Sequence, residues 1–108
     1  MQSIISPRQS IGNESMQFNW NENKASINLA KHGVSFKEAQ TVFDDPLFVD
    51  FYDPNHSYDE LRYLIIGESD KERWLIVLYT EQDEVTRIIS AKENDFIILF
   101  YPEYLVMG

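Results

Sequence analysis

The sequence contains no cysteine, and this absence excludes two kinds of structure. Its 108 residues can form neither a disulfide nor a thiolate metal site. Such a composition is compatible with a reducing compartment. The chain has only two histidines, and they are far apart in the sequence, which makes a dedicated metal site improbable. We therefore expect no metal and no cofactor.

Basic residues are scarce. The chain has 9 lysines and arginines against 18 aspartates and glutamates, which gives a net charge of −9. Non-specific nucleic-acid binding depends on cations that neutralise phosphates, so this balance argues against it. A small basic site inside an acidic surface remains compatible. An acidic protein would also attract a basic partner.

Long apolar runs and familiar catalytic motifs are also absent. No run of about 18 apolar residues exists, so we predict no membrane span. The chain has no G-x-x-x-x-G-K-[ST], G-x-G-x-x-G, H-E-x-x-H or G-x-S-x-G. Residues 1–15 are polar and lack the apolar region of a secretory signal, and we interpret them as a flexible N-terminal tail.

The stretch NKASINLAKHGVSFKEAQTVFDDP predicts two helices joined by a glycine turn. Asn21 can cap a first helix over residues 22–32, and Gly33 stands where a left-handed residue ends it. Ser35 and Glu38 have the spacing of a capping box for a second helix, which Pro46 follows. The expected apolar side chains are Ile27, Leu29 and Ala30 in the first helix and Phe36, Ala39, Val42 and Phe43 in the second.

Aromatic and β-branched residues predict strands in the rest of the chain. The short polar turns ESDKE and EQDE imply an antiparallel meander. We therefore expect an α+β fold, a small antiparallel sheet with the two N-terminal helices packed on one face. The expected strands span residues 16–20, 47–53, 61–67, 73–80 and 84–90.

The C-terminal segment, residues 94–108, has a different character. Phe96 to Tyr101 form an unbroken apolar run that precedes Pro102. A sixth strand and a shifted reading frame at the end of the gene both fit this pattern.

Two arginines lie inside otherwise apolar strands, in the contexts L-R-Y-L-I-I and V-T-R-I-I-S. A charged side chain there must face water, a partner or a pocket. If the strands are neighbours or near-neighbours in the sheet, Arg62 and Arg87 could converge on one face, and guanidinium groups match the geometry of phosphate. Lys92 could join them. The alternative, which we rank slightly ahead, is that each arginine pairs with one of the many carboxylates.

Three further side chains have both a functional and a structural interpretation. His32 can transfer protons, but a cation also suits the carbonyl end of a helix, which we favour. His56 lies in the loop DPNHSYDE and reads as an exposed turn residue. Tyr79 can stack on a base or donate a proton, although such a tyrosine is more often a half-buried sheet residue.

The combination of F-N-W-N-E-N-K-A-S-I-N-L-A-K-H-G-V-S-F-K-E-A-Q-T-V-F-D-D-P, R-Y-L-I-I-G, V-L-Y-T-E and R-I-I-S-A-K resembles the BrnT family of bacterial toxins over residues 16–93. The resemblance implies a RelE-like fold and a cytoplasmic, metal-independent endoribonuclease that cleaves mRNA and arrests growth. It also implies a hetero-oligomer with an antitoxin, BrnA, whose ribbon-helix-helix region binds DNA, so that the toxin reaches DNA only through its partner.

The resemblance assigns roles to particular residues. His32 corresponds to the histidine of the family's K-H-G motif, Arg62 and Arg87 to its strand arginines, and Lys92 to the second arginine of R-I-I-S-A-R. We expect Arg62 and Arg87 to stabilise the phosphate, His32 or Tyr79 to transfer a proton, and Lys92 to bind RNA.

The chain departs from the family after Glu93, where a basic helix of the form K-A-T-x-x-E-R-x-x-Y-E is replaced by N-D-F-I-I-L-F-Y-P-E-Y-L. That loss removes cations that would help to hold RNA. The alternative function is therefore a degenerate toxin, an antitoxin-binding module without ribonuclease activity.

Overall fold

The computed structural model describes residues 16–94. The predicted tail over residues 1–15 and the apolar run after Asp95 therefore lie outside the described residues. In the described part, the order is β1 (Gln17–Asn19), α1 (Glu22–His32), α2 (Phe36–Thr41), η3 (Val42–Asp44), β2 (Val49–Tyr52), η4 (Pro54–His56), β3 (Arg62–Glu68), β4 (Trp74–Gln82) and β5 (Val85–Glu93).

Helix α1 begins and ends as the sequence predicts, and α2 begins as predicted but ends at Thr41, where the 3-10 helix η3 follows it. The side chain of Asn21 accepts a hydrogen bond from the Lys24 amide, and Gly33 ends α1 with a φ of 70°. The Ser35 side chain accepts from the Glu38 amide at the start of α2. Glycine suits the position after α1 because other residues strain at a positive φ.

One five-stranded sheet contains all the strands found in residues 16–94, in the order β1-β5-β4-β3-β2. Strands β2 to β5 form the predicted antiparallel meander, and the α+β fold class is confirmed. The sequence did not reveal that β1 pairs with the start of β5 in a parallel direction. A register shift at Leu78/Tyr79 interrupts the β4–β5 pairing, and irregularities of this kind increase strand twist.

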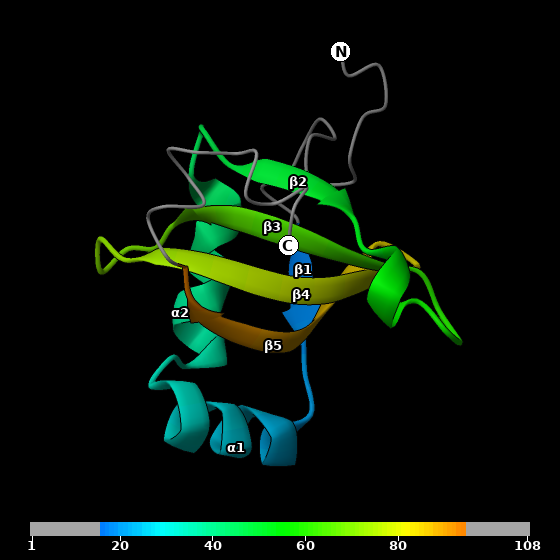
Figure 1. The fold of residues 1–108 in the computed structure, drawn as a ribbon, viewed down its shortest axis with the longest axis horizontal. Helices are drawn as coiled ribbons and strands as arrows, with labels where there is room; N and C mark the ends of the chain where they lie inside the picture. Colours follow the sequence, from blue (N-terminus) through cyan, green and yellow to red (C-terminus); the bar gives the residue numbers. More distant parts are fainter. Residues whose placement is uncertain (1–15, 95–108) are drawn as a thin grey trace.

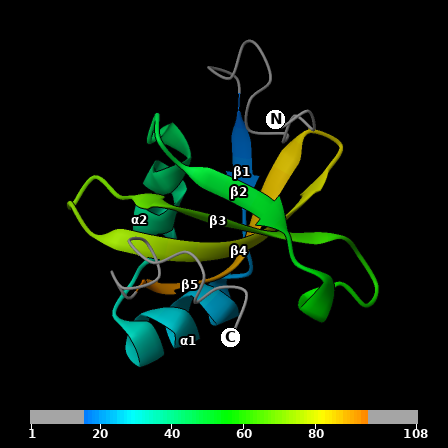
Figure 2. The ribbon, with the colours of Figure 1, turned by 45° about the horizontal axis from the view of Figure 1, so that its top comes forward.

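The hydrophobic core lies between the sheet and α2, which crosses one face of the sheet (Figure 1). The turned view in Figure 2 also places α2 against that face and α1 beside β5. The predicted apolar residues of α2 and η3 are all buried, and strands β3 to β5 supply the opposite side of the core. The buried apolar residues from the helical segments are Phe36, Ala39, Val42 and Phe43, and those from the strands include Ile65, Leu75, Val77, Tyr79 and Ile88.

The predicted apolar side of α1 is wrong. Ile27 and Leu29 are 63% and 51% exposed, whereas Asn28 is buried. The Asn28 amide nitrogen donates to the backbone oxygens of Val34 and Ala91, and its oxygen accepts from the Ala91 amide. These bonds satisfy a buried polar group and join α1 to β5, so hydrogen bonding rather than hydrophobicity selects the inward face.

Candidate functional site

The candidate site lies on the face of the sheet that points away from α2, opposite the face on which Tyr79 is buried. Because side chains alternate along a strand, paired residues on neighbouring strands share a face. Arg62 of β3 pairs with Thr80 of β4, which in turn pairs with Arg87 of β5. This arginine row, formed by Arg62, Thr80 and Arg87, brings together the two arginines that the sequence singled out.

Glu60 joins the two guanidinium groups. The Nε and Nη2 atoms of Arg62 donate to Glu60 Oε2 at 3.2 and 3.1 Å. Nη2 of Arg87 lies 2.8 Å from both carboxylate oxygens. The predicted convergence and the alternative of carboxylate pairing are therefore both present, with one carboxylate serving both arginines.

The electrostatics of this cluster favour the ionised form of Glu60. Partial burial raises the pKa of Glu60, but hydrogen bonds from Arg87 and Arg62, together with their charges, outweigh it and hold that pKa below its ordinary value. The carboxylate is thus ionised at neutral pH. Two guanidinium groups that hold one carboxylate can also hold a phosphate, which has similar oxygens.

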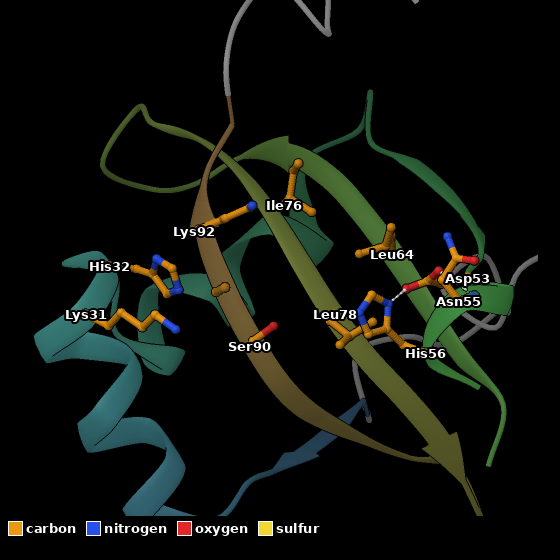
Figure 3. A pocket seen from close by; sticks show the side chains of 11 residues that line it. Lys31, His32, Asp53, Asn55, His56, Leu64, Ile76, Leu78, Ser90 and Lys92 are labelled. Carbon is orange, nitrogen blue, oxygen red and sulfur yellow. Dashed lines mark hydrogen bonds and ion pairs between the residues drawn. The ribbon is translucent and has the colours of Figure 1, made fainter. Parts of the chain in front are cut away.

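A cavity of about 510 Å³ lies on the sheet next to the arginine row. The next row of side chains on the same face is formed by Leu64 on β3, Leu78 on β4 and Ser90 on β5. On β3 and β4 this row lies two residues from the arginine row, which is about 7 Å along a strand. On β5 the bulge lies between the two rows. In Figure 3 the cavity extends from α1 on one side to η4 on the other. The residues that line it are Lys31, His32, Asp53, Asn55, His56, Leu64, Ile76, Leu78, Ser90, Ala91 and Lys92.

Two predicted site residues lie on the α1 side of this cavity. His32 is the last residue of α1 and Lys92 is on β5, and both line the cavity with Lys31 (Figure 3). The basic side chains at the end of α1 also complement the helix dipole, so the structural interpretation of His32 is compatible with its place at the cavity.

An aspartate–histidine pair lies on the opposite side of the cavity. Asp53 precedes η4 and accepts the Asn55 amide through Oδ1 at 3.1 Å, which caps this short helix. Its Oδ2 lies 2.6 Å from Nδ1 of His56. The side chain of Asp53 is 7% exposed and that of His56 is 59% exposed. A buried carboxylate therefore orients an accessible imidazole.

Tyr79 is not brought to the arginine row. It follows Leu78 and precedes Thr80, so its ring points to the helix-covered face, where it is 0% exposed and packs against Phe43 and Tyr63. Its hydroxyl donates to Asp50 at 2.7 Å. This placement matches the structural interpretation of a sheet tyrosine.

Sequence reasoning did not single out Glu60, and it treated His56 as an exposed turn residue. Both lie between β2 and β3, in a loop whose residues are typical of an ordinary turn. The available signals were the three-residue spacing of Asp53 and His56 and the E-L-R sequence at Glu60. Among residues 16–94, no group of three or more histidine, aspartate and glutamate side chains is placed to hold a metal ion.

Comparisons with known proteins agree on one family. The family model described as "Ribonuclease toxin, BrnT, of type II toxin-antitoxin system" matches residues 20–95. The solved structure of the Brucella abortus ribonuclease toxin, BrnT, aligns with a TM-score of 0.56 and 21% sequence identity, over 75% of this chain and 99% of that chain. At that identity the likeness shows the fold. No curated protein sequence matches the chain.

Proposed function

The chain belongs to the BrnT family of ribonuclease toxins of type II toxin–antitoxin systems, and from this premise we propose that it is a metal-independent endoribonuclease that cleaves mRNA in the cytoplasm and arrests growth. The observation that carries the proposal is the convergence of Arg62 and Arg87 on one anion. A ribonuclease must hold the scissile phosphate and stabilise the charge that develops on it, which two fixed guanidinium groups can do.

RNA would bind when one of its phosphates replaces the Glu60 carboxylate between the two guanidinium groups. Glu60 lies in the loop before β3, and its side chain is 29% exposed, so solvent reaches the cluster. A phosphate that replaces or shares the Glu60 contacts would meet donors already arranged for two oxygens. Lys92 and Lys31 would extend the positive charge along the cavity, where Lys92 would bind RNA and His32 is a candidate for proton transfer.

Membership of a type II toxin family implies an antitoxin partner. We propose that this partner is BrnA-like, with a ribbon-helix-helix region that binds DNA, and that the two form a hetero-oligomer. The net charge of −9 favours association with a basic protein. Among the described residues, no helix is long and apolar enough to cross a membrane.

A second candidate function is an antitoxin-binding module without ribonuclease activity. The observation that favours it is Glu60, which already fills the anion position between the arginines. Induction of this chain alone in bacteria separates the two functions. We expect growth arrest that co-expression of the antitoxin relieves, whereas normal growth with folded, soluble protein would favour the binding module.

Substitution of the arginines tests the site itself. We expect Arg62→Ala and Arg87→Ala each to lower the RNA cleavage rate by about 10²–10³-fold, because each removes a donor to the phosphate. The measurement is cleavage of a labelled RNA in EDTA by purified protein, with circular dichroism to verify folding.

Lys37→Ala is the matched control for these variants. It removes the same charge from an exposed position on α2, away from the arginine row. Cleavage at the wild-type rate by both arginine variants would refute their role. Dependence on added Mg²⁺ would refute metal independence.

A further inference from the structure

We propose that His56, oriented by Asp53, is the general base of the RNA cleavage reaction and that Nε2 of its imidazole is the atom that receives the proton. This proposal rests on the ribonuclease function proposed above and adds to it a residue that neither the sequence nor the family comparison assigned. The geometry that carries it is a buried carboxylate beneath an accessible histidine at the rim of the cavity, close to the arginine row.

The Asp53–His56 contact determines which ring nitrogen is available. An aspartate carboxylate can only accept hydrogen bonds, so Nδ1 of His56 donates its proton across the 2.6 Å contact with Oδ2. In the neutral ring, Nε2 then carries the lone pair. A carboxylate that fixes the tautomer and orientation of a histidine in this way also stabilises the imidazolium that forms when Nε2 takes a proton.

The backbone places this pair beside the arginine row. The amide of Asp53 donates to the backbone oxygen of Arg62 at 2.9 Å, which continues the β2–β3 pairing by one step. Ser57 Oγ donates a hydrogen bond to the backbone oxygen of Asp53 and accepts one from the backbone amide of Arg62. Residues on both sides of His56, Asp53 and Ser57, are therefore hydrogen-bonded to the backbone of Arg62, where β3 begins.

The cavity gives the substrate a place beside the arginine row, with His56 at its rim. His56 lines it together with Leu64, Leu78 and Ser90, which follow the arginine row along the strands (Figure 3). A phosphate held by Arg62 and Arg87 would bring its attached ribose to this part of the cavity. The apolar side chains of Leu64 and Leu78 offer a surface for a nucleobase or ribose.

The proposed step moves one proton, forms one P–O bond and breaks another. The 2′-oxygen attacks the adjacent phosphorus while His56 Nε2 takes the 2′-hydroxyl proton, and the P–O5′ bond breaks with its electron pair on the 5′-oxygen. That oxygen takes a proton from water, and the resulting hydroxide removes the proton from the imidazolium. The products are a 2′,3′-cyclic phosphate and a 5′-hydroxyl, and the enzyme returns to its starting state.

His32 is the competing residue, since it lines the same cavity. Among residues 16–94, however, the only histidine whose ring contacts a carboxylate is His56. His32 lies across the cavity on α1, whereas His56 belongs to the loop that is bonded to Arg62 (Figure 3). The orientation and the backbone connection both favour His56.

The test uses His56→Ala and Asp53→Asn in the full chain, with a labelled RNA in EDTA. We expect kcat to fall by about 10²–10⁴-fold for His56→Ala, the usual contribution of a general base, while KM changes little. Added imidazole should restore part of the activity of this variant, and the rise of the rate with pH should disappear from its profile. Asp53→Asn keeps an oxygen to cap the Asn55 amide and should lower kcat.

Asp59→Asn is the matched control for Asp53→Asn, because it makes the same chemical change on an exposed residue of the same loop. If wild-type protein cleaves RNA and His56→Ala cleaves equally fast, the role of His56 is refuted and the ribonuclease function stands. A slow but folded His56→Ala variant that imidazole does not rescue also refutes a proton-transfer role. If folded wild-type protein cleaves no RNA, the proposed function fails and this inference falls with it.

Discussion

Arg62 and Arg87 are charged side chains in strands whose other residues are mostly apolar, and Glu60 makes that placement stable. Each guanidinium is partly buried, with side-chain exposures of 27% and 37%, and removal of a charge from water is costly unless a partner compensates. One carboxylate compensates both. At the scale of the residue, the cluster therefore stabilises two partly buried charges in the free protein, and the same donors would hold the phosphate in the proposed function.

Tyr79 allows a residue-scale prediction that separates a structural from a catalytic role. We expect Tyr79→Phe to lower the free energy of unfolding by about 1–2 kcal/mol, because the variant loses the hydrogen bond to Asp50. Urea unfolding measures this loss. RNA cleavage per folded molecule should not change. A large loss of cleavage with normal stability would instead support the proton-transfer role considered for this tyrosine.

At the scale of elements, Glu38 joins α2 to the turn between β3 and β4. Its Oε2 accepts from Arg73 Nε at 3.0 Å and from Ser69 Oγ at 2.6 Å. Arg73 also donates to the Gly33 oxygen, where α1 ends. The capping-box glutamate predicted from the sequence thus uses its side chain for tertiary contacts, because a buried carboxylate gains more from a cation than from a backbone amide.

This ion pair predicts how stability depends on pH. The hydrogen bond from Arg73 lowers the pKa of Glu38, burial opposes that effect, and Ser69 adds to it, so the pKa lies below its ordinary value of 4.5. A carboxyl with a depressed folded-state pKa stabilises the protein fully above its unfolded-state pKa and loses that contribution as the pH falls through the folded-state value. The Glu38 contribution should therefore be complete at pH 7 and decline below about pH 4.5.

The corresponding variant is Glu38→Gln. We expect it to lower the free energy of unfolding by about 1.5–3 kcal/mol at pH 7, with a smaller difference from wild type below pH 4. Chemical denaturation at several pH values measures both. Glu93→Gln is the control, because Glu93 lies 4.0 Å from Arg73 but is 60% exposed. An equal loss in both variants would contradict the importance of burial.

At the scale of the whole molecule, a small cationic site lies in an acidic protein. Under the proposed function, the net charge of −9 would repel RNA at long range, while the arginine row, Lys92 and Lys31 would attract it at short range. Such a protein would bind RNA through few phosphate contacts. Specific geometry would then contribute a larger share of the affinity than it does in strongly basic RNA-binding proteins.

Salt dependence provides the measurement. Single-stranded nucleic acids give a slope of about −0.7 in log K against log salt for each phosphate contact, so four cations imply a slope no steeper than about −3. We expect this shallow slope for a 2′-deoxy oligonucleotide, which lacks the attacking hydroxyl, in a titration followed by fluorescence anisotropy. A slope near −6 would show that further cations bind RNA.

The sequence by itself determined the local structure. The caps at Asn21 and Ser35, the turn at Gly33 and the strands of the meander depend on short-range patterns of residues, and these the sequence displays directly. It also singled out Arg62 and Arg87, since a charge inside an apolar strand is visible without coordinates. The motifs over residues 16–93 also identified the BrnT family of toxins.

Only the tertiary structure decided which side chains meet. Strand register placed Arg62 and Arg87 on either side of Thr80 and turned Tyr79 to the opposite face. The packing of α1 against β5 buried Asn28 in place of Ile27. Loop geometry brought Glu60 to the arginines and Asp53 to His56. These contacts join different elements or depend on the path of one loop, and a shift of one residue in register would reverse the faces, so local patterns in the sequence do not contain them.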